Sequence, residues 1–239
     1  MSTVLAFVIM GSALLVGAMV QSSVGLGLGL VGAPVISLVD PTLMPATLLI
    51  GTAALPMFTI GSEWRHIDWR GISWGLAGRL LGTGLGVAVV ASLDPKTLGA
   101  AIGAMVLAAV AVSLWRVHVR ITPWSLVIAG AVSGTTGTAT SIGGPPMALL
   151  YQRESGPTVR STLAGYFVVG TIVSLAALAL GGQFEPRQAG MGLALLPFII
   201  AGFLLGRPLR HIIDAGRLRV ALLAVVTVSG TVLLIQSLL

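Results

Sequence analysis

Eight long apolar stretches follow one another along this chain of 239 residues, separated by short polar segments. A helix that crosses the hydrocarbon core of a bilayer needs about 20 predominantly apolar residues, and it satisfies its backbone hydrogen bonds within itself. No stretch alternates with the period of a barrel strand. The sequence therefore predicts an all-α, polytopic membrane protein, whose apolar stretches run over 4–39, 42–60, 71–91, 97–115, 124–150, 158–180, 188–206 and 218–237.

The few charged residues support this prediction. They make up 8% of the chain, whereas a soluble domain carries about 25%, so no separate soluble domain is expected. The net charge of +6 comes from lysines and arginines that lie mostly in the short segments between apolar stretches. That pattern is typical of membrane topology and not of nucleic-acid binding. We therefore expect the lipid bilayer, and no nucleic acid, as a partner.

An internal repeat is the most informative pattern in the chain. Gly17–Pro34 reads GAMVQSSVGLGLGLVGAP and Gly130–Pro146 reads GAVSGTTGTATSIGGPP, so both open on Gly-Ala and close on Gly-x-Pro. We predict two repeated halves, 1–120 and 121–239; the alternative is a chance similarity between apolar sequences. GxxxG pairs, which are typical of close helix packing, occur in both halves at Gly78/Gly82 and Gly202/Gly206.

The basic residues indicate how the two halves are oriented. If every apolar stretch crossed the membrane, the two sides would carry five and seven basic residues, which is hardly a bias. If 4–39 and 124–150 are instead re-entrant hairpins with arms of about 16 residues, the halves are inverted and each adds three transmembrane helices to its hairpin. The alternative is that residues 4–22 cross on their own. In the hairpin topology Lys96 and Arg187 face one side, and the other side carries Arg65, Arg70, Arg116, Arg120, Arg153, Arg160, Arg207, Arg210, Arg217 and Arg219.

The two glycine-rich centres are the first candidate for a binding site. Glycine and proline at this density break helices, and a break within a membrane is tolerated where the freed backbone is buried in protein or lines a wet cavity. The new helix N-terminus then presents unpaired N–H groups, which with nearby hydroxyls form a cradle for an anion. Pro34 and Pro146 are predicted to begin the second arm of each hairpin. The alternative is that the small residues only let helices pack closely.

Arg79 is the second candidate, because it lies near the centre of the 71–91 stretch. A cation at that depth costs about 2.5 kcal/mol or more, and none of the apolar stretches contains a carboxylate that would pair with it. A planar guanidinium binds two oxygens of an oxyanion at once, so Arg79 suits an anionic substrate. The alternative is that its side chain snorkels to the membrane surface.

Catalytic and metal-binding chemistry is not expected. His66, His118 and His211 lie in polar segments, so neither a Ser–His dyad nor a histidine metal cluster is predicted at membrane depth. All seven carboxylates also lie outside the apolar stretches, so proton coupling would run through the substrate or through a loop residue. We therefore predict no enzyme activity, no metal and no cofactor.

The function predicted from these features is transport of a small anion. Repeat transporters work by rocking one half against the other around a fixed site, so we expect alternating access. An anion channel with a glycine-lined pore is the alternative function, and a membrane scaffold without transport is a third. The predicted substrate-binding residues are Gln21, Ser22, Ser23, Gly25, Gly27, Gly29, Gly32, Pro34, Arg79, Thr135, Thr136, Gly137, Thr138, Ser141, Gly143, Gly144 and Pro145.

Four short motifs point to a known family. They are the closing Gly-x-Pro of each glycine-rich centre, Gly32–Pro34 and Gly144–Pro146, and the sequences Pro45-Ala46-Thr47 and Arg160-Ser161-Thr162 near the start of the next stretch. With them, essentially the whole chain resembles the sulfite exporter TauE/SafE family of membrane permeases. The resemblance implies a multi-pass protein of the bacterial inner membrane that takes up or exports a sulfur-containing anion, such as sulfite, a sulfonate, sulfoacetate or thiosulfate. It assigns no role to Arg79, and it leaves the coupling proton or ion and the formation of a homo-oligomer open.

Overall fold

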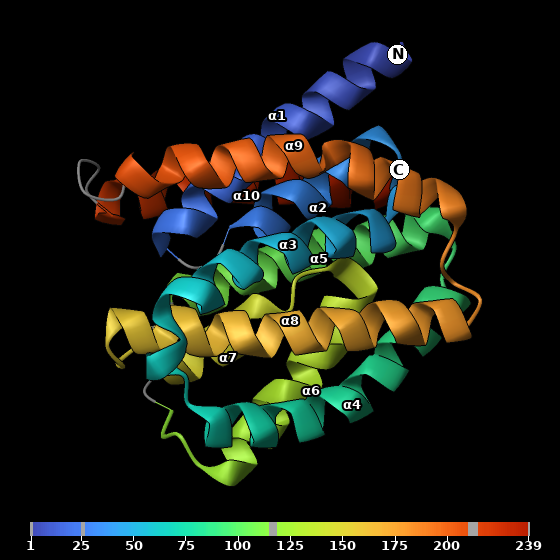
Figure 1. The fold of residues 1–239 in the computed structure, drawn as a ribbon. Coiled ribbons are helices and arrows are strands. Elements are labelled where there is room, and N and C mark those ends of the chain that lie inside the picture. The colour runs from blue at the N-terminus through green and yellow to red at the C-terminus, as the bar shows by residue number, and fades with distance from the viewer. Residues whose placement is uncertain (1, 25–26, 115–118, 210–214, 239) are drawn as a thin grey trace.

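The apolar stretches fold into ten α-helices in the computed structural model, which describes residues 2–24, 27–114, 119–209 and 215–238. Helices and turns make up these ranges without a strand, so the all-α prediction is confirmed (Figure 1). The helices are α1 (Thr3–Val24), α2 (Leu28–Val39), α3 (Ala46–Glu63), α4 (Trp69–Ser92), α5 (Pro95–Leu114), α6 (Pro123–Thr140), α7 (Gly144–Tyr151), α8 (Gly156–Leu180), α9 (Pro186–Leu209) and α10 (Ala215–Leu238), with short 3-10 helices at Pro41–Leu43 and Trp64–His66.

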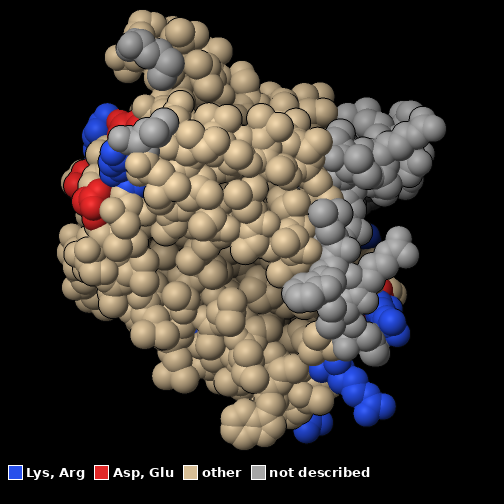
Figure 2. All heavy atoms as spheres, turned by 180° about the vertical axis from the view of Figure 1, so that it is seen from behind, with Lys and Arg blue, Asp and Glu red and all other residues tan. Residues whose placement is uncertain are grey.

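Five of the described helices are long and apolar enough to cross a membrane. Large apolar side chains on their outer faces are exposed, including Leu81 of α4 at 71% and Leu180 of α8 at 91%. An exposed apolar surface of this extent is expected where lipid covers the protein, and Figure 2 shows one broad face of it without charged side chains. The protein is therefore a polytopic membrane protein, with candidate spans at Thr3–Ser22, Trp69–Ser92, Pro95–Val112, Gly156–Leu180 and Pro186–Pro208.

Both stretches that were predicted to be hairpins are interrupted. Within 4–39, α1 ends at Val24 and α2 begins at Leu28, and α2 folds back so that Leu28 packs against Gly17 of α1. Within 124–150, α6 ends at Thr140, and the next residue, Ser141, has a φ of 62° in the left-handed region. α7 folds back so that Gly143, the residue before it, packs against Ser133 of α6. The prediction that each glycine-rich centre breaks a helix is confirmed.

The arms of the hairpins differ from the equal arms that were predicted. α1 and α2 have 22 and 12 residues, and α6 and α7 have 18 and 8. α1 continues through Ser22 because its hydroxyl donates to the carbonyl of Met19, one turn earlier in the same helix. Pro34 was wrongly expected to begin the second arm; it lies inside α2, which begins at Leu28, where the Gln21 side chain accepts the hydrogen bond of the first N–H group. Pro146 lies in the first turn of α7, as predicted.

The helices interlock across the middle of the chain. α4 packs along α6, α1 along α9, α5 along α10 and α3 along α8. Each of these pairs joins a helix of residues 1–120 to a helix of residues 121–239. Figure 1 accordingly shows helices from the two ends of the sequence side by side in one bundle.

The GxxxG pairs lie where helices approach each other most closely, as predicted. A β-carbon at Gly78 or Gly82 of α4 would overlap backbone carbonyls of α6, those of Val127 and Ala131. Gly202 and Gly206 of α9 lie in the same way against the backbone of α1. Without side chains at these positions the two backbones touch, which maximises van der Waals contact between helices in lipid.

Charged side chains gather at two opposite ends of the bundle (Figure 2). The connections from α3 to α4 and from α7 to α8 lie at one end, and those from α4 to α5 and from α8 to α9 lie at the other (Figure 1). Arg116, Arg210 and the side chains of Arg217 and Arg219 lie outside what the structure describes. Of the remaining basic residues in the segments between helices and at their ends, Lys96 and Arg187 belong to the second end, and the first end carries Arg65, Arg70, Arg120, Arg153, Arg160 and Arg207.

The contact between α4 and α6 can be tested with two glycines two residues apart. We expect Gly82→Ala to lower the free energy of unfolding by about 1–3 kcal/mol, because the added methyl group overpacks the contact with Ala131. Gly84→Ala is the matched control, since a β-carbon there meets nothing within 4 Å. Thermal unfolding of the purified variants in detergent checks this. Equal melting temperatures for both variants would contradict the close packing.

Candidate functional site

A cavity of about 60 Å³ lies between the two helix interruptions. Gly29 of the first interruption packs directly against the carbonyl of Ser141 in the second. At about 15 Å³ for each water molecule, the cavity has room for about four, which is the size of a small oxyanion. The cavity is lined by Gln21, Gly27, Gly29, Leu30, Leu49, Thr52, Pro56, Arg79, Gly137, Ser141, Ile142, Gly143, Gly144, Pro145, Phe167 and Thr171.

Two helices begin at this cavity. The residue before α2 is Gly27 and the residue before α7 is Gly143, and both line the cavity. Neither glycine has a side chain that could cap its helix. In α2 the Leu28 N–H is bonded to the Gln21 side chain, and in α7 Gly144 is the only one of the first three residues with an N–H, because Pro145 and Pro146 have none. The N-terminal N–H groups and the positive end of the helix dipole favour a negatively charged ligand at such a position.

Arg79 is buried in the wall of the cavity, with only 2% of its surface exposed. Its Nη1 donates to the Ser133 hydroxyl at 3.2 Å and its Nη2 to the Ser174 hydroxyl at 3.3 Å. The guanidinium also lies 5.1 Å from the centre of the Tyr166 ring, a cation–π contact. The alternative that Arg79 snorkels to the surface is therefore wrong.

The charge of Arg79 is left without a counter-charge. No side chain that the structure describes forms an ion pair with it, and its Nε has no hydrogen-bond partner. Within the described chain, neither an acidic residue nor a histidine lines the cavity. A buried cation of this kind favours binding of an anion, because the anion supplies the missing charge. The Nε itself lies against Gly170 of α8.

The arginine is connected to the second interruption through Ser133. The Ser133 hydroxyl, which accepts from Arg79, donates to the carbonyl of Gly143 at 2.5 Å. Ser174 shares a 2.8 Å hydrogen bond with Thr138. Gly170 leaves the space that the guanidinium occupies, since a β-carbon there would overlap it. The position of Arg79 is therefore set by residues of α6 and α8.

Nine of the predicted site residues line the cavity together. Gly25 and the side chain of Ser23 lie outside what the structure describes. The hydroxyls of Thr135 and Thr136 donate to the carbonyls of Ala131 and Val132 in their own helix, so they do not point into the cavity. Ser22, Gly32, Pro34 and Thr138 also lie outside the lining. The nine that the structure brings together are Gln21, Gly27, Gly29, Arg79, Gly137, Ser141, Gly143, Gly144 and Pro145.

The residues that hold Arg79 and most of the apolar wall were not among the predicted site residues. Ser174 and Thr171 lie three residues apart in α8 and therefore on one face of that helix. Two hydroxyls on one face near the middle of an apolar span were a signal that could have identified them. The apolar wall residues Leu30, Leu49 and Phe167 carry no such signal, because their neighbours in the sequence are equally apolar.

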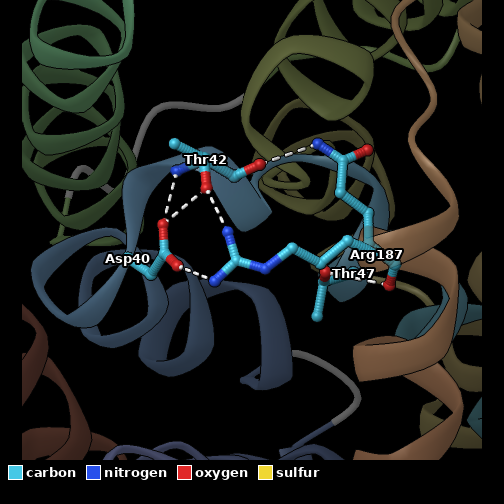
Figure 3. Close-up of polar contacts among 5 residues, drawn as sticks. Asp40, Thr42, Thr47 and Arg187 are labelled. Carbon is cyan, nitrogen blue, oxygen red and sulfur yellow. Dashed lines mark hydrogen bonds and ion pairs between the residues drawn. The ribbon is translucent and has the colours of Figure 1, made fainter. Parts of the chain in front are cut away.

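At one end of the bundle, the corner between α2 and α3 is bonded to the start of α9 (Figure 3). Arg187 pairs with the Asp40 carboxylate at 2.7 Å and donates to the Thr42 hydroxyl at 3.2 Å. Gln188 donates to the carbonyls of Thr42 and Met44 at 2.9 and 3.2 Å. Gln188 is 5% exposed, whereas the Arg187 side chain is 63% exposed.

The opposite end has a comparable set of contacts. The Tyr151 hydroxyl, at the end of α7, donates to the Asp68 carboxylate at 2.8 Å. The backbone N–H of Asp68 donates to the Thr162 hydroxyl of α8 at 3.0 Å. The start of α4 is thereby bonded to the start of α8, so hydrogen bonds join residues before and after position 120 at both ends of the bundle.

Comparisons with known proteins identify a family. The sequence model described as "Sulfite exporter TauE/SafE" matches residues 9–233. No curated protein and no solved structure matches the chain. The family match extends over both helix interruptions and Arg79.

The contacts at the α9 end predict unequal effects of neighbouring substitutions. We expect Gln188→Ala to lower the free energy of unfolding by about 1–3 kcal/mol, because the buried carbonyl of Met44 and the partly buried carbonyl of Thr42 lose their donor. Arg187→Ala should cost less than about 1 kcal/mol, because its ion pair is open to solvent. Thermal unfolding in detergent measures both. A larger loss for Arg187→Ala would show that the ion pair, and not the buried amide, holds this corner.

Proposed function

The chain belongs to the sulfite exporter TauE/SafE family, and on this premise we propose that it is a secondary transporter of a small sulfur-containing anion in a bacterial inner membrane. The family implies a membrane transporter of sulfur anions and not an enzyme. Sulfite, a sulfonate, sulfoacetate and thiosulfate are the substrates that this proposal includes. Among them, the cavity of about 60 Å³ favours the small inorganic anions.

The observation that carries the proposal is the meeting of Arg79 with two helix N-termini in one cavity. The guanidinium has an unpartnered Nε and two hydrogen bonds to neutral hydroxyls at 3.2 and 3.3 Å. Hydrogen bonds to a charged acceptor are stronger than such neutral ones. A bound oxyanion would therefore compete well for the guanidinium while its other oxygens accept from N–H groups in the first turn of α2 and from the Gly144 N–H of α7.

The packing of the helices supports two repeated, inverted halves, 1–120 and 121–239. Suppose that α1 to α5 correspond in order to α6 to α10. The contact of α4 with α6 then has its counterpart in the contact of α9 with α1, and the contact of α3 with α9 has its counterpart in the contact of α8 with α4. The connection from α3 to α4 and its counterpart from α8 to α9 lie at opposite ends of the bundle (Figure 1). Corresponding segments at opposite ends are what inversion requires. We place the arginine-rich end in the cytoplasm.

Alternating access is the mechanism that this arrangement favours. The cavity lies between segments of both halves, and hydrogen bonds join the halves at each end of the bundle. Breaking the contacts of Arg187 and Gln188 with the α2–α3 corner would open one end while those of Asp68 hold the other, and the reverse movement would open the second end. An anion channel, the alternative, would need both ends open at once.

Flux of labelled sulfite into proteoliposomes tests the proposed function. We expect saturable flux that Arg79→Ala reduces at least about 10-fold, because a hydrogen bond to a charged group contributes about 1.5–3 kcal/mol. The flux of Arg79→Lys should lie between that of the unchanged protein and that of Arg79→Ala, since an ammonium cannot bind two oxygens in one plane. Lys96→Ala, an exposed residue at the end of the bundle, is the control that keeps its flux. Unchanged flux in a well-folded Arg79→Ala protein would exclude this site.

Binding can also be measured without transport. We expect sulfite to raise the melting temperature of the purified protein, with a stabilisation of about 2.7 kcal/mol at a concentration 100 times the Kd. The same concentration of a large anion such as a citrate should have a smaller effect. The absence of any shift would favour a membrane scaffold that does not transport.

A further inference from the structure

The unneutralised charge of Arg79 bears on how transport is coupled. We infer that the coupling partner is a second anion carried in the opposite direction, so that the protein is an anion exchanger; this rests on the proposed function. The inference begins from the guanidinium, which is 2% exposed and bonded to Ser133 and Ser174, with its Nε unpartnered. None of the side chains that the structure describes around it carries a negative charge.

The empty and the loaded site differ in charge. In alternating access the cavity is closed to both sides at one point of the cycle. If it holds no anion, closure leaves Arg79 without a counter-ion, and an uncompensated charge in a low-dielectric site is costly. If it holds a singly charged anion, the closed cavity is neutral. The loaded protein therefore changes its open side readily, and the empty protein does so slowly, which is the kinetic basis of exchange.

A coupling proton finds no carrier on the cavity wall. Over the described chain the wall has no aspartate, glutamate or histidine. The titratable group nearest to Arg79 is Tyr166, whose ring stacks on the guanidinium at 5.1 Å and whose hydroxyl donates to the carbonyl of Gly130 at 3.5 Å. Ser174 is bonded to the Thr138 hydroxyl, which in turn donates to the hydroxyl of Thr83. A coupling cation is disfavoured because Arg79 lines the same cavity.

The size of the effect follows from the cost of an unpaired cation at membrane depth. We expect exchange to exceed net transport by about 70-fold or more, which is the rate equivalent of about 2.5 kcal/mol. A neutral side chain at position 79 should remove most of this ratio, even where it weakens binding. A lysine should keep the ratio, because it keeps the charge.

The experiment compares two sets of proteoliposomes that take up labelled sulfite at equal pH. One set contains unlabelled sulfite; the other contains none, and potassium with valinomycin carries the compensating charge. We expect rapid uptake only in the first set, and a protonophore should leave it unchanged. Equal rates in the two sets, or uptake that requires a proton gradient, would overturn exchange and leave the proposed transport function intact. No uptake in either set would overturn the proposed function, and the inference with it.

Substitutions of Arg79 separate exchange from other causes of a high ratio. Arg79→Gln should bring the ratio of exchange to net uptake close to one, and Arg79→Lys should keep it high at a lower affinity. Lys96→Ala controls for the loss of a positive charge elsewhere and should keep the ratio. A high ratio that persists in Arg79→Gln would overturn the assignment of coupling to this charge. Melting temperatures of the variants establish that each is folded.

Discussion

Within a bilayer every charge and every backbone polar group must find its partner in the protein, and the structure is organised around the group for which this is least complete. Arg79 lies at the centre of the bundle with two hydroxyl acceptors, one aromatic ring and an unused Nε. The two helix interruptions beside it leave further N–H groups without helical partners. The guanidinium and the two helix N-termini lie at one cavity, where we propose that a small anion binds.

Close helix packing makes this arrangement possible. Glycines along α4 bring its backbone against that of α6 at Val127 and Ala131. The same contact places Arg79 beside Ser133, and Gly170 of α8 leaves the space for the guanidinium. The glycines that pack α4 against α6 therefore also position the arginine that lines the cavity. Close packing and a binding site, the two interpretations of the small residues, do not exclude each other.

The sequence predicted those features that break the uniformity of an apolar chain. Glycine clusters identified both interruptions, and a lone arginine in an apolar stretch identified Arg79. Arm lengths could not be predicted, because Ser22 is accommodated inside α1 by a bond to Met19, and Pro34 is tolerated inside α2. Thr135 and Thr136 were misplaced for the same reason, since a hydroxyl in lipid can bond within its own helix. The partners of Arg79 depend on contacts between distant segments, which no local pattern encodes.

The interlocking of helices also bears on the order in which the chain is made. The described partners of Arg79 are Ser133, Tyr166 and Ser174, and all three follow it in the sequence. When α4 leaves the ribosome, α6 and α8 have not yet been synthesised. During translation Arg79 therefore lacks its native contacts until α6 and α8 are made, and the first half reaches its native packing only as the second half is inserted. Folding of this protein is thus tied to completion of the polypeptide.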